Sequence, residues 1–490
     1  MDTITTKYPA VRNFVNGNFI EADSPDFIDV ISPVDGSLLS TVPLASKDTL
    51  NKAVAAAKAA FPRWSATPVK ERAQIFYRYR ELLLRYSHEL SLLISEENGK
   101  TYTESKAEID KVIELTEFAC SMPQMASGES LEVSKGVECR SEHVPLGVVA
   151  SIVPFNFPSM VPHWSIPNAL ILGNTMVIKP SERVPLSLSR VAELLKTAGL
   201  PDGVFNIVNG TKEIVEAICD HPDIEAISFI GSTKIAKLVY ARGTSNFKRV
   251  LALGGAKNHL IVLPDAHPEM TASNIVASVT GCAGQRCMAA SVMLAVGEVD
   301  HIVERIVSES KKGVCGNNLG AVISKDAKNR IERYITEAEA QGAKILVDGR
   351  NVVVKGKEGG FYVGPTIIDY VKPEMAVARE EIFGPVLSIV RVSNAGEAIA
   401  IERANLYGNA VGIFTQSGSA AKYLADEASA GMVGINIGVP VPREPFSFGG
   451  WNESKFGALD ITGKSSIEFW TKLKKITTKW NPEAGVNWMS

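Results

Sequence analysis

The stretch "VPLGVVASIVPF" at residues 144–155 is almost continuously apolar and ends at a proline step. A strand buried on both faces has this pattern, which is typical of parallel sheets. It opens an alternation of strand-like and helix-like segments that runs to about residue 255. Strand-like segments follow at 175–180, 204–208, 225–230 and 248–253, with helix-like segments at 159–173, 185–200, 211–220 and 232–243. The alternation predicts an α/β fold with a parallel, doubly wound sheet.

The flanking regions add a second unit and two peripheral elements. A further alternation of helix and strand patterns covers 267–445, and helical patterns precede the first sheet at 46–62 and 69–98. Residues 128–144 have the pattern of a polar hairpin. The segment "SSIEFWTKLKKITTKW" (465–480) is predicted to be one short strand at a sheet edge, available to pair with another element or another subunit.

The bulk composition excludes several classes of protein. The 490 residues suggest two or three domains at roughly 150 residues each. The 51 basic and 54 acidic residues give a net charge of −3, which does not favour a nucleic acid partner. We find no signal peptide, no transit peptide and no apolar run of membrane-spanning length, so we expect a cytoplasmic protein without membrane contact.

Neither the cysteines nor the histidines are spaced like a disulfide framework or a metal site. Six cysteines occur, without a CxxC pair, and seven histidines, without HxH or HxxxH spacing. We therefore predict no bound metal and no disulfides. The six are Cys120, Cys139, Cys219, Cys282, Cys287 and Cys315.

Cys287 has the local context of a reactive thiol. It lies in "GCAGQRCMAAS" (281–291), a glycine-containing connection between a helical pattern and a strand pattern. Its neighbour Arg286 would favour the thiolate if its guanidinium points toward the sulfur. A lone cysteine is more often a small buried apolar residue, so this context alone leaves both interpretations open. Cys282 is expected to lie inside the end of the helix and to be inert.

Other polar residues follow predicted strands, at the sheet edge where open α/β sheets bind ligands. Asn156, after 144–155, would hold an oxyanion together with the Cys287 N–H. In "SFIGSTKIA" (228–236) a strand meets a helix N-terminus, which could receive a pyrophosphate, but without a GxGxxG pattern this segment alone favours an ordinary turn. Lys179 and Glu182 lie in "IKPSER" (178–183), where a carboxylate can accept from ribose hydroxyls.

Taken together, these motifs resemble the aldehyde dehydrogenase superfamily over nearly the whole chain. The segments "PFNFP", "KPSE", "FIGS", "GQRCMA" and "EEIFGPV" occur in the family's order. The resemblance implies a Rossmann-like NAD domain (1–123 and 142–253), an α/β catalytic domain (254–447) and small oligomerisation elements (124–141 and 448–490). It also implies a homotetramer or homodimer.

The resemblance implies roles residue by residue. Cys287 corresponds to the nucleophile and Asn156 to the oxyanion donor. The residues that correspond to the NAD site are Val153, Phe155, Lys179, Glu182, Arg183, Gly231, Ser232, Glu381 and Phe383. A free carboxylate at Glu182 would repel a 2′-phosphate, which favours NAD over NADP. One departure is Ala236, where the family usually has a second glycine.

A second departure concerns the base that activates water in hydrolytic members. The family's glutamate falls on Leu253 or, aligned by the two glycines, on Ala252. A second glutamate used by some relatives falls on Lys472. A thioester on Cys287 would thus lack an evident base for water, whereas a thiol, being partly ionised, needs less activation.

This pattern is similar to one branch of the family, the CoA-acylating methylmalonate-semialdehyde (malonate-semialdehyde) dehydrogenases. "GAKNH" and "VPVPREPFSFGGWNESKFG" also resemble that branch. It implies NAD-dependent oxidation of a small acidic semialdehyde, loss of CO2 and transfer to CoA, giving propionyl-CoA or acetyl-CoA. Two arginines of the branch grip the substrate carboxylate. One corresponds to Arg286, and the other falls on Lys111, which lacks the bidentate fork of arginine.

Two alternatives remain at this point. A hydrolytic NAD-dependent aldehyde dehydrogenase acting on another small acidic aldehyde would turn over steadily without CoA. A non-catalytic NAD-binding scaffold would form no NADH from any aldehyde, but the joint presence of Cys287, Asn156 and Glu381 disfavours it.

Overall fold

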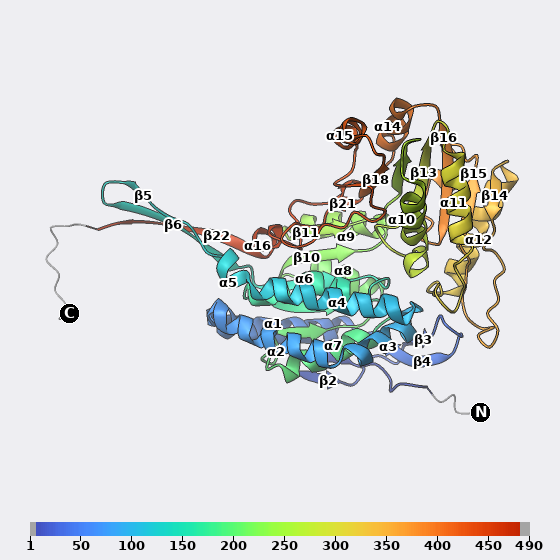
Figure 1. The fold of residues 1–490 in the computed structure, drawn as a ribbon. Helices are drawn as coiled ribbons and strands as arrows, with labels where there is room; N and C mark the ends of the chain where they lie inside the picture. The colour runs from blue at the N-terminus through green and yellow to red at the C-terminus, as the bar shows by residue number, and fades with distance from the viewer. Residues whose placement is uncertain (1–5, 481–490) are drawn as a thin grey trace, which may run out of the picture.

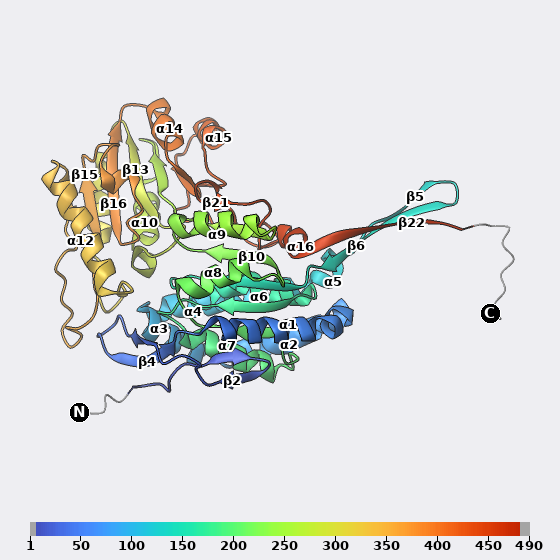
Figure 2. The same cartoon turned by 180° about the vertical axis from the view of Figure 1, so that it is seen from behind.

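The computed structural model describes residues 6–480, so residues 1–5 and the 481–490 end of the predicted oligomerisation segment lie outside the description. Two sheets, each covered by helices, make up the body, and a thin arm projects from it (Figures 1 and 2). The predicted α/β class is confirmed.

The first sheet has eight strands in the order β2-β1-β9-β8-β7-β10-β11-β21. The five central strands, β9 to β11 in this order, are parallel. The chain moves from β7 outward to β8 and β9, and then returns to the other side of β7 to form β10 and β11. The bounds are β1 (Asn13–Val15), β2 (Asn18–Ile20), β7 (Val148–Ile152), β8 (Thr175–Lys179), β9 (Phe205–Ile207), β10 (Ile224–Ile230), β11 (Arg249–Leu253) and β21 (Lys455–Phe456).

This strand order fixes where a ligand can bind. The connections leave β7 in opposite directions, so a crevice opens beyond the carboxyl ends of β7 and β10. All five residues of β7 are buried, as the apolar stretch predicts.

Helices cover both faces of the first sheet. On one face, α1, α8 and α9 share a core with the sheet, and on the other face α2, α3, α4, α6 and α7 do so. The bounds are α1 (Lys47–Ala66), α2 (Val69–Arg85), α3 (Ser87–Asn98), α4 (Tyr102–Cys120), α5 (Met122–Met125), α6 (Met160–Ile171), α7 (Leu186–Thr197), α8 (Lys212–Asp220) and α9 (Thr233–Ser245). A capping box starts α4, in which Thr101 accepts from the Glu104 N–H and Glu104 accepts from the Thr101 N–H.

The second sheet has seven strands in the order β14-β15-β16-β13-β12-β18-β19, parallel except for β14. Its strands are β12 (Asn258–Val262), β13 (Ala290–Val296), β14 (Lys344–Val347), β15 (Thr366–Asp369), β16 (Val386–Val392), β18 (Ala410–Phe414) and β19 (Met432–Ile435). The helical elements of this part are α10 (Pro268–Thr280), the 3-10 turn η1 (Gly281–Gly284), α11 (Asp300–Ser310), α12 (Lys325–Ala340), α13 (Ala376–Arg379), α14 (Ala395–Arg403) and α15 (Gly418–Glu427). Two short ladders complete the body: β3 (Phe27–Ile31) with β4 (Leu38–Pro43), and β17 (Tyr407–Gly408) with β20 (Trp451–Asn452).

The arm is a three-stranded antiparallel sheet in the order β22-β6-β5. The predicted hairpin supplies β5 (Ser130–Ser134) and β6 (Val137–Pro145), and β22 (Thr471–Lys479) pairs with the whole of β6. In Figures 1 and 2 the arm extends well beyond the body.

One expectation about local structure needs correction. Residues 465–480 are not one strand, because α16 (Ser465–Trp470) precedes β22 and buries Phe469 and Trp470 in the body. The helical pattern predicted at 69–98 is confirmed and forms two helices, which meet at Tyr86.

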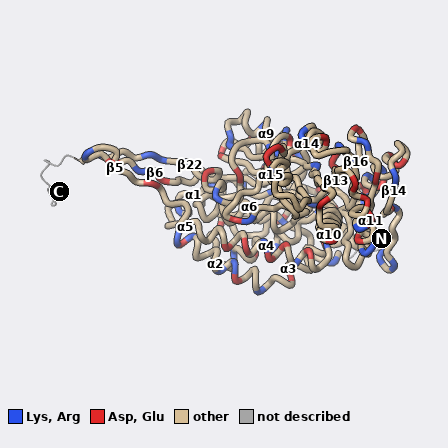
Figure 3. Tube along the Cα trace, turned by 45° about the horizontal axis from the view of Figure 1, so that its top comes forward, with Lys and Arg blue, Asp and Glu red and all other residues tan. Residues whose placement is uncertain are grey.

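In Figure 3 the basic and acidic positions are interspersed over the body. Within residues 6–480, no helix has both the length and the apolar character needed to cross a membrane.

Candidate active site

A cavity of about 760 Å³ lies at the carboxyl ends of β7, β8, β10 and β11 and reaches the second sheet's loops. It brings together eleven of the thirteen residues singled out from the sequence. These are Val153, Phe155, Asn156, Lys179, Glu182, Arg183, Gly231, Ser232, Cys287, Glu381 and Phe383. Arg286 and Lys111 do not line this cavity.

The loop before Cys287 is held in an unusual backbone conformation. Cys282 and Ala283 have φ values of 53° and 52°, in the left-handed region that costs a residue with a Cβ about 1–3 kcal/mol. Cys282 therefore lies in the turn η1 after α10 and not inside the helix end, although it is buried as expected. A Cβ on Gly284 would meet the Gly384 carbonyl oxygen at 2.1 Å. This close approach packs the Cys287 loop against the loop that carries Glu381.

The main chain at Cys287 is fixed by two amides. Asn258 Nδ2 and Asn409 Nδ2 donate to the Cys287 carbonyl oxygen at 2.7 and 2.9 Å. Burial, reinforced by the negative charge of Glu381, raises the pKa of the Cys287 thiol to about 12, and Arg286 opposes this rise only in part. Arg286 thus lowers the pKa of Cys287, as predicted, but burial and Glu381 raise that pKa by more.

Arg286 is committed to the end of α10. Its Nη2 donates to the carbonyl oxygens of Ala277 and Ser278 at 2.6 and 2.8 Å. A cation at a helix C-terminus is favoured by the helix dipole. The Arg286 Nε is buried and has no hydrogen-bond partner among the described residues.

Asn156 faces the Cys287 loop. Its Nδ2 donates one hydrogen to the Gln285 carbonyl oxygen at 3.0 Å, and the Gln285 Oε1 in turn accepts from the Ile323 N–H at 3.0 Å. An amide has two N–H bonds, so one remains for another acceptor.

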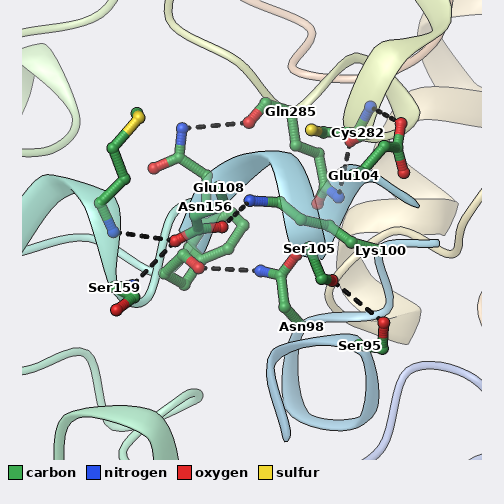
Figure 4. A network of polar contacts seen from close by, with 12 residues as sticks. Ser95, Asn98, Lys100, Glu104, Ser105, Glu108, Asn156, Ser159, Cys282 and Gln285 are labelled. Atoms are coloured by element: carbon green, nitrogen blue, oxygen red, sulfur yellow. Dashed lines mark hydrogen bonds and ion pairs between the residues drawn. The ribbon is translucent and has the colours of Figure 1, made fainter. Parts of the chain in front are cut away.

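A buried network on α4 supports both loops (Figure 4). Glu108 Oε1 accepts from the N–H groups of Ser159 and Met160 at 2.8 and 2.9 Å, and its Oε2 lies 2.5 Å from Lys100 Nζ. One turn earlier, Glu104 Oε1 accepts from the Cys282 N–H at 2.5 Å. The same helix face therefore holds the start of α6, which follows Asn156, and the loop that leads to Cys287.

The opposite part of the cavity has charged and amide groups at strand ends. Lys179 Nζ lies 3.1 Å from Glu182 Oε2. Burial acts to raise the pKa of Glu182, but the Lys179 charge prevails and holds that pKa below its usual range. At the N-terminus of α9, the Ser232 side chain caps no N–H. A Cβ on Gly231 would meet the Phe229 ring at 2.6 Å, so only glycine keeps this space clear.

Glu381 lies between the two sheets' loops. Its Oε1 accepts from the Ala256 N–H at 3.0 Å, and burial raises its pKa. A Cβ on Gly255 would meet Glu381 Oε2 at 2.5 Å. Arg330 Nη1 donates to the Ile382 carbonyl oxygen at 2.7 Å and so anchors this loop. Phe383 packs its ring edge-to-face with Phe155, with centroids 5.9 Å apart.

The positions where hydrolytic relatives have a glutamate carry no carboxylate here. Ala252 and Leu253 end β11 and are buried. Lys472 is exposed on β22 and pairs with Val144 in the arm. Lys111 is in an ion pair, with its Nζ 2.7 Å from Glu444 Oε2.

Several residues that shape the site were missed in the sequence. They are Lys100, Glu104, Glu108, Asn258, Arg330 and Asn409. The sequence contained a signal for three of them. Glu104 and Glu108 have i, i+4 spacing on a helix, and Asn258 lies in the motif "GAKNH". Arg330 and Asn409 act through main-chain contacts that no local pattern reveals.

Comparison with known proteins identifies the family. The model of the aldehyde dehydrogenase family matches residues 19–476. The chain belongs to the aldehyde dehydrogenase family.

Within the family, the chain is similar to enzymes of one substrate class. It is 43% identical to malonate-semialdehyde dehydrogenase 1 of Geobacillus thermodenitrificans, over 97% of this chain and 100% of the relative. It is 44% identical to malonate-semialdehyde dehydrogenase of Pseudomonas aeruginosa, over 97% of each chain. The predicted resemblance to this branch is confirmed.

The chain is also similar to solved structures in fold and in sequence. The crystal structure of methylmalonate-semialdehyde dehydrogenase from Oceanimonas doudoroffii superposes with a TM-score of 0.95 at 43% identity, covering 97% of this chain and 99% of the other. A Sinorhizobium meliloti protein solved in complex with NAD matches with the same TM-score at 40% identity, covering 97% of this chain and 99% of the other.

Proposed function

We propose that this protein oxidises malonate or methylmalonate semialdehyde with NAD and transfers the decarboxylated acyl group to CoA. One observation carries the proposal: Cys287, Asn156 and Glu381 line one cavity, while the positions of the hydrolytic glutamate are Ala252 and Leu253. The similarity to enzymes named for these semialdehydes supports the substrate class.

Cys287 is the nucleophile in this proposal. Its thiolate attacks the aldehyde carbon, and the free N–H of Asn156 with the Cys287 N–H stabilises the oxyanion. The pKa near 12 keeps the thiol neutral in the free enzyme, so its proton must pass to solvent water as the sulfur attacks. The strained turn before Cys287 and the two amides on its carbonyl hold the sulfur-bearing residue in one place.

The groups in the cavity fit a dinucleotide. Lys179 and the ionised Glu182 suit the hydroxyls of the adenosine ribose, and the uncapped α9 N-terminus at Ser232 suits the pyrophosphate. Glu381 would accept from the second ribose, and Val153, Phe155, Arg183, Gly231 and Phe383 would shape the walls. When bound, NAD supplies the acceptor for the hydride that leaves the substrate carbon.

Release of the acyl group is assigned to CoA. Oxidation leaves Cys287 as a thioester, and loss of the β-carboxylate as CO2 leaves an enolate that takes up a proton. The CoA sulfur then attacks the thioester carbonyl, the bond from that carbonyl to the Cys287 sulfur breaks, and the Cys287 sulfur takes up the proton that the CoA thiol loses. Malonate semialdehyde gives acetyl-CoA and methylmalonate semialdehyde gives propionyl-CoA. A thiol nucleophile fits a site without a carboxylate at 252 or 253.

The assembly and its location are also proposals. We expect a homotetramer or homodimer that assembles through the arm, where Leu131, Val133 and Leu473 are exposed apolar side chains on edge strands. Light scattering of the purified protein tests this assembly. We expect the protein to work in the cytoplasm.

The test is NADH formation from malonate semialdehyde at enzyme concentrations high enough to see one turnover. We expect a burst of one NADH per active site without CoA, and steady turnover once CoA is added. Equal steady rates in both conditions would reject CoA transfer in favour of hydrolysis. Absence of NADH from any aldehyde would reject an enzymatic role. The C287S variant, which keeps the fold but lacks the thiol, is the matched control.

A further inference from the structure

An ion pair joins α4 to the loop at 438–447. Lys111 Nζ lies 2.7 Å from Glu444 Oε2, and the two side chains are only 20% and 13% exposed. Lys111 Nζ also lies 3.2 Å from Glu114 Oε2. The lysine that corresponds to a substrate-binding arginine is therefore already bound by two carboxylates of the protein.

Lys111 lies on the face of α4 whose carboxylates bind two loops of the site. Glu104, Glu108 and Lys111 have i, i+4, i+7 spacing and share one face of α4. Glu104 binds the loop before Cys287, and Glu108 binds the start of α6 after Asn156. Lys111 is the next residue on this face, and its own partners are Glu114 and Glu444.

Glu444 lies in a loop that starts beside the residues that hold Arg286. Ser278 Oγ donates to the Gly438 carbonyl oxygen at 2.6 Å, and the Ser278 carbonyl oxygen accepts from Arg286 Nη2 at 2.8 Å. The loop at 438–447 thus runs from the anchor of Arg286 to Lys111. Arg286 and the loop at 438–447 both bind Ser278, and the same loop reaches Lys111 through Glu444.

The charges around Lys111 determine how this part of the site interacts with a substrate carboxylate. A free lysine attracts a carboxylate, but here the Glu444 carboxylate neutralises Lys111 and would repel a second anion placed nearby. Arg443, the neighbouring cation, is 81% exposed and lies 3.9 Å from Glu114, so it does not restore a positive charge at Lys111. Built-in repulsion of this kind is a common means of discrimination between ligands.

We propose that Glu444 is a specificity-determining residue that competes with the substrate carboxylate for Lys111. The inference rests on the proposed function, because it concerns an aldehyde with an acidic end. It means that Arg286 carries most of the preference for acidic over neutral aldehydes, and that Glu444 lowers this preference.

The test compares malonate semialdehyde with propanal, a neutral aldehyde of the same chain length. The readout is the ratio of the two second-order rate constants of the NADH burst, measured without CoA. We expect E444Q to raise the ratio of acid to neutral about tenfold, because it frees a cation and removes a like charge. E444A is a second variant that makes the same change if E444Q folds poorly.

Two further variants isolate the pair. In K111M/E444Q the gain over K111M should be smaller, because no cation remains to be freed and only the removal of the like charge is left. D110N removes an exposed carboxylate from the same helix, where it pairs with Lys106, and should leave the ratio unchanged. An unchanged or lower ratio in both E444Q and E444A would overturn the inference, as would a gain of undiminished size without Lys111.

The design keeps this inference apart from the proposed function. Steady turnover without CoA would refute CoA transfer. The ratio of the rate constants for malonate semialdehyde and propanal would still test the role of Glu444. If the wild-type protein reacts with propanal and not with malonate semialdehyde, the proposed substrate is wrong. A reaction with malonate semialdehyde that is gained in E444Q would then support the role of Glu444, and no gain would overturn it.

Discussion

The buried pair between Lys100 and Glu108 allows a sharp test of how the site is supported. Their side chains are 2% and 0% exposed, and Lys100 Nζ also lies 3.6 Å from the centre of the Phe157 ring. The K100M variant would leave the Glu108 charge buried without its cation. Breaking a buried pair from one side costs about 3–5 kcal/mol, so we expect a loss of this size in the free energy of unfolding.

The same substitution should impair the reaction. Glu108 holds the N–H groups of Ser159 and Met160, three and four positions after Asn156, so a shift of Glu108 displaces the oxyanion donor. We expect the burst rate to fall by about tenfold or more, because small misplacements of positioned groups are costly. Urea unfolding followed by tryptophan fluorescence and the NADH burst measure the two effects.

Two variants serve as controls. K106M removes an exposed lysine from the same helix, where it pairs with Asp110, and should cost about 1 kcal/mol or less. The double variant K100M/E108Q should cost less than the sum of its single changes, since neither charge is left alone. If K100M proved as mild as K106M, the argument that this buried pair supports the site would be refuted.

Three further predictions follow from the charges of the site and the core. Because burial and Glu381 raise the pKa of Cys287 to about 12, alkylation of Cys287 by iodoacetamide should rise about tenfold per pH unit from pH 7 to 9. E381Q should accelerate this alkylation. Peptide mass spectra measure the alkylation rate, and a rate that stops rising below pH 8 would contradict the reasoning. Because Glu182 is ionised and would repel the 2′-phosphate of NADP, E182Q should lower the KM for NADP about tenfold or more. An unchanged ratio of the KM for NADP to the KM for NAD would count against this repulsion. Burial raises the pKa of Glu97 to about 7 from an ordinary value of 4.5, so its contribution to stability is full below pH 4.5 and is lost as the pH rises through 7. E97Q should therefore gain stability relative to the wild-type protein between pH 5 and 7, and parallel unfolding profiles of the two proteins would disprove this.

The first sheet was predictable because its signals are local. Residues 148–152 are apolar except for Ser151, and strand and helix patterns alternate around them, so the parallel sheet and its ligand-binding edge follow from short windows. Cys287, Asn156 and Glu381 come from separate segments, and only the family resemblance placed them together before the structure did so.

Other features depend on contacts that no short window contains. The left-handed conformation of Cys282 and Ala283 is imposed by packing against the Gly384 loop and by Glu104, which lies 178 positions away from Cys282. The division of 465–480 into helix and strand arises because Phe469 and Trp470 fill the core, while the residues after them pair with β6. Tertiary packing overrides local propensity in both places.

The pairing of β22 with β6 has a consequence for how the protein is made. His143 and Thr471 meet across this ladder although 328 positions separate them. At about 5–20 residues per second, the ribosome adds β22 roughly 15–65 s after β6. Throughout that interval β5 and β6 form a two-stranded ribbon, which is marginally stable in water. The arm is thus completed late in translation, and until then the side of β6 that β22 will cover presents open main-chain groups to other nascent chains and to chaperones.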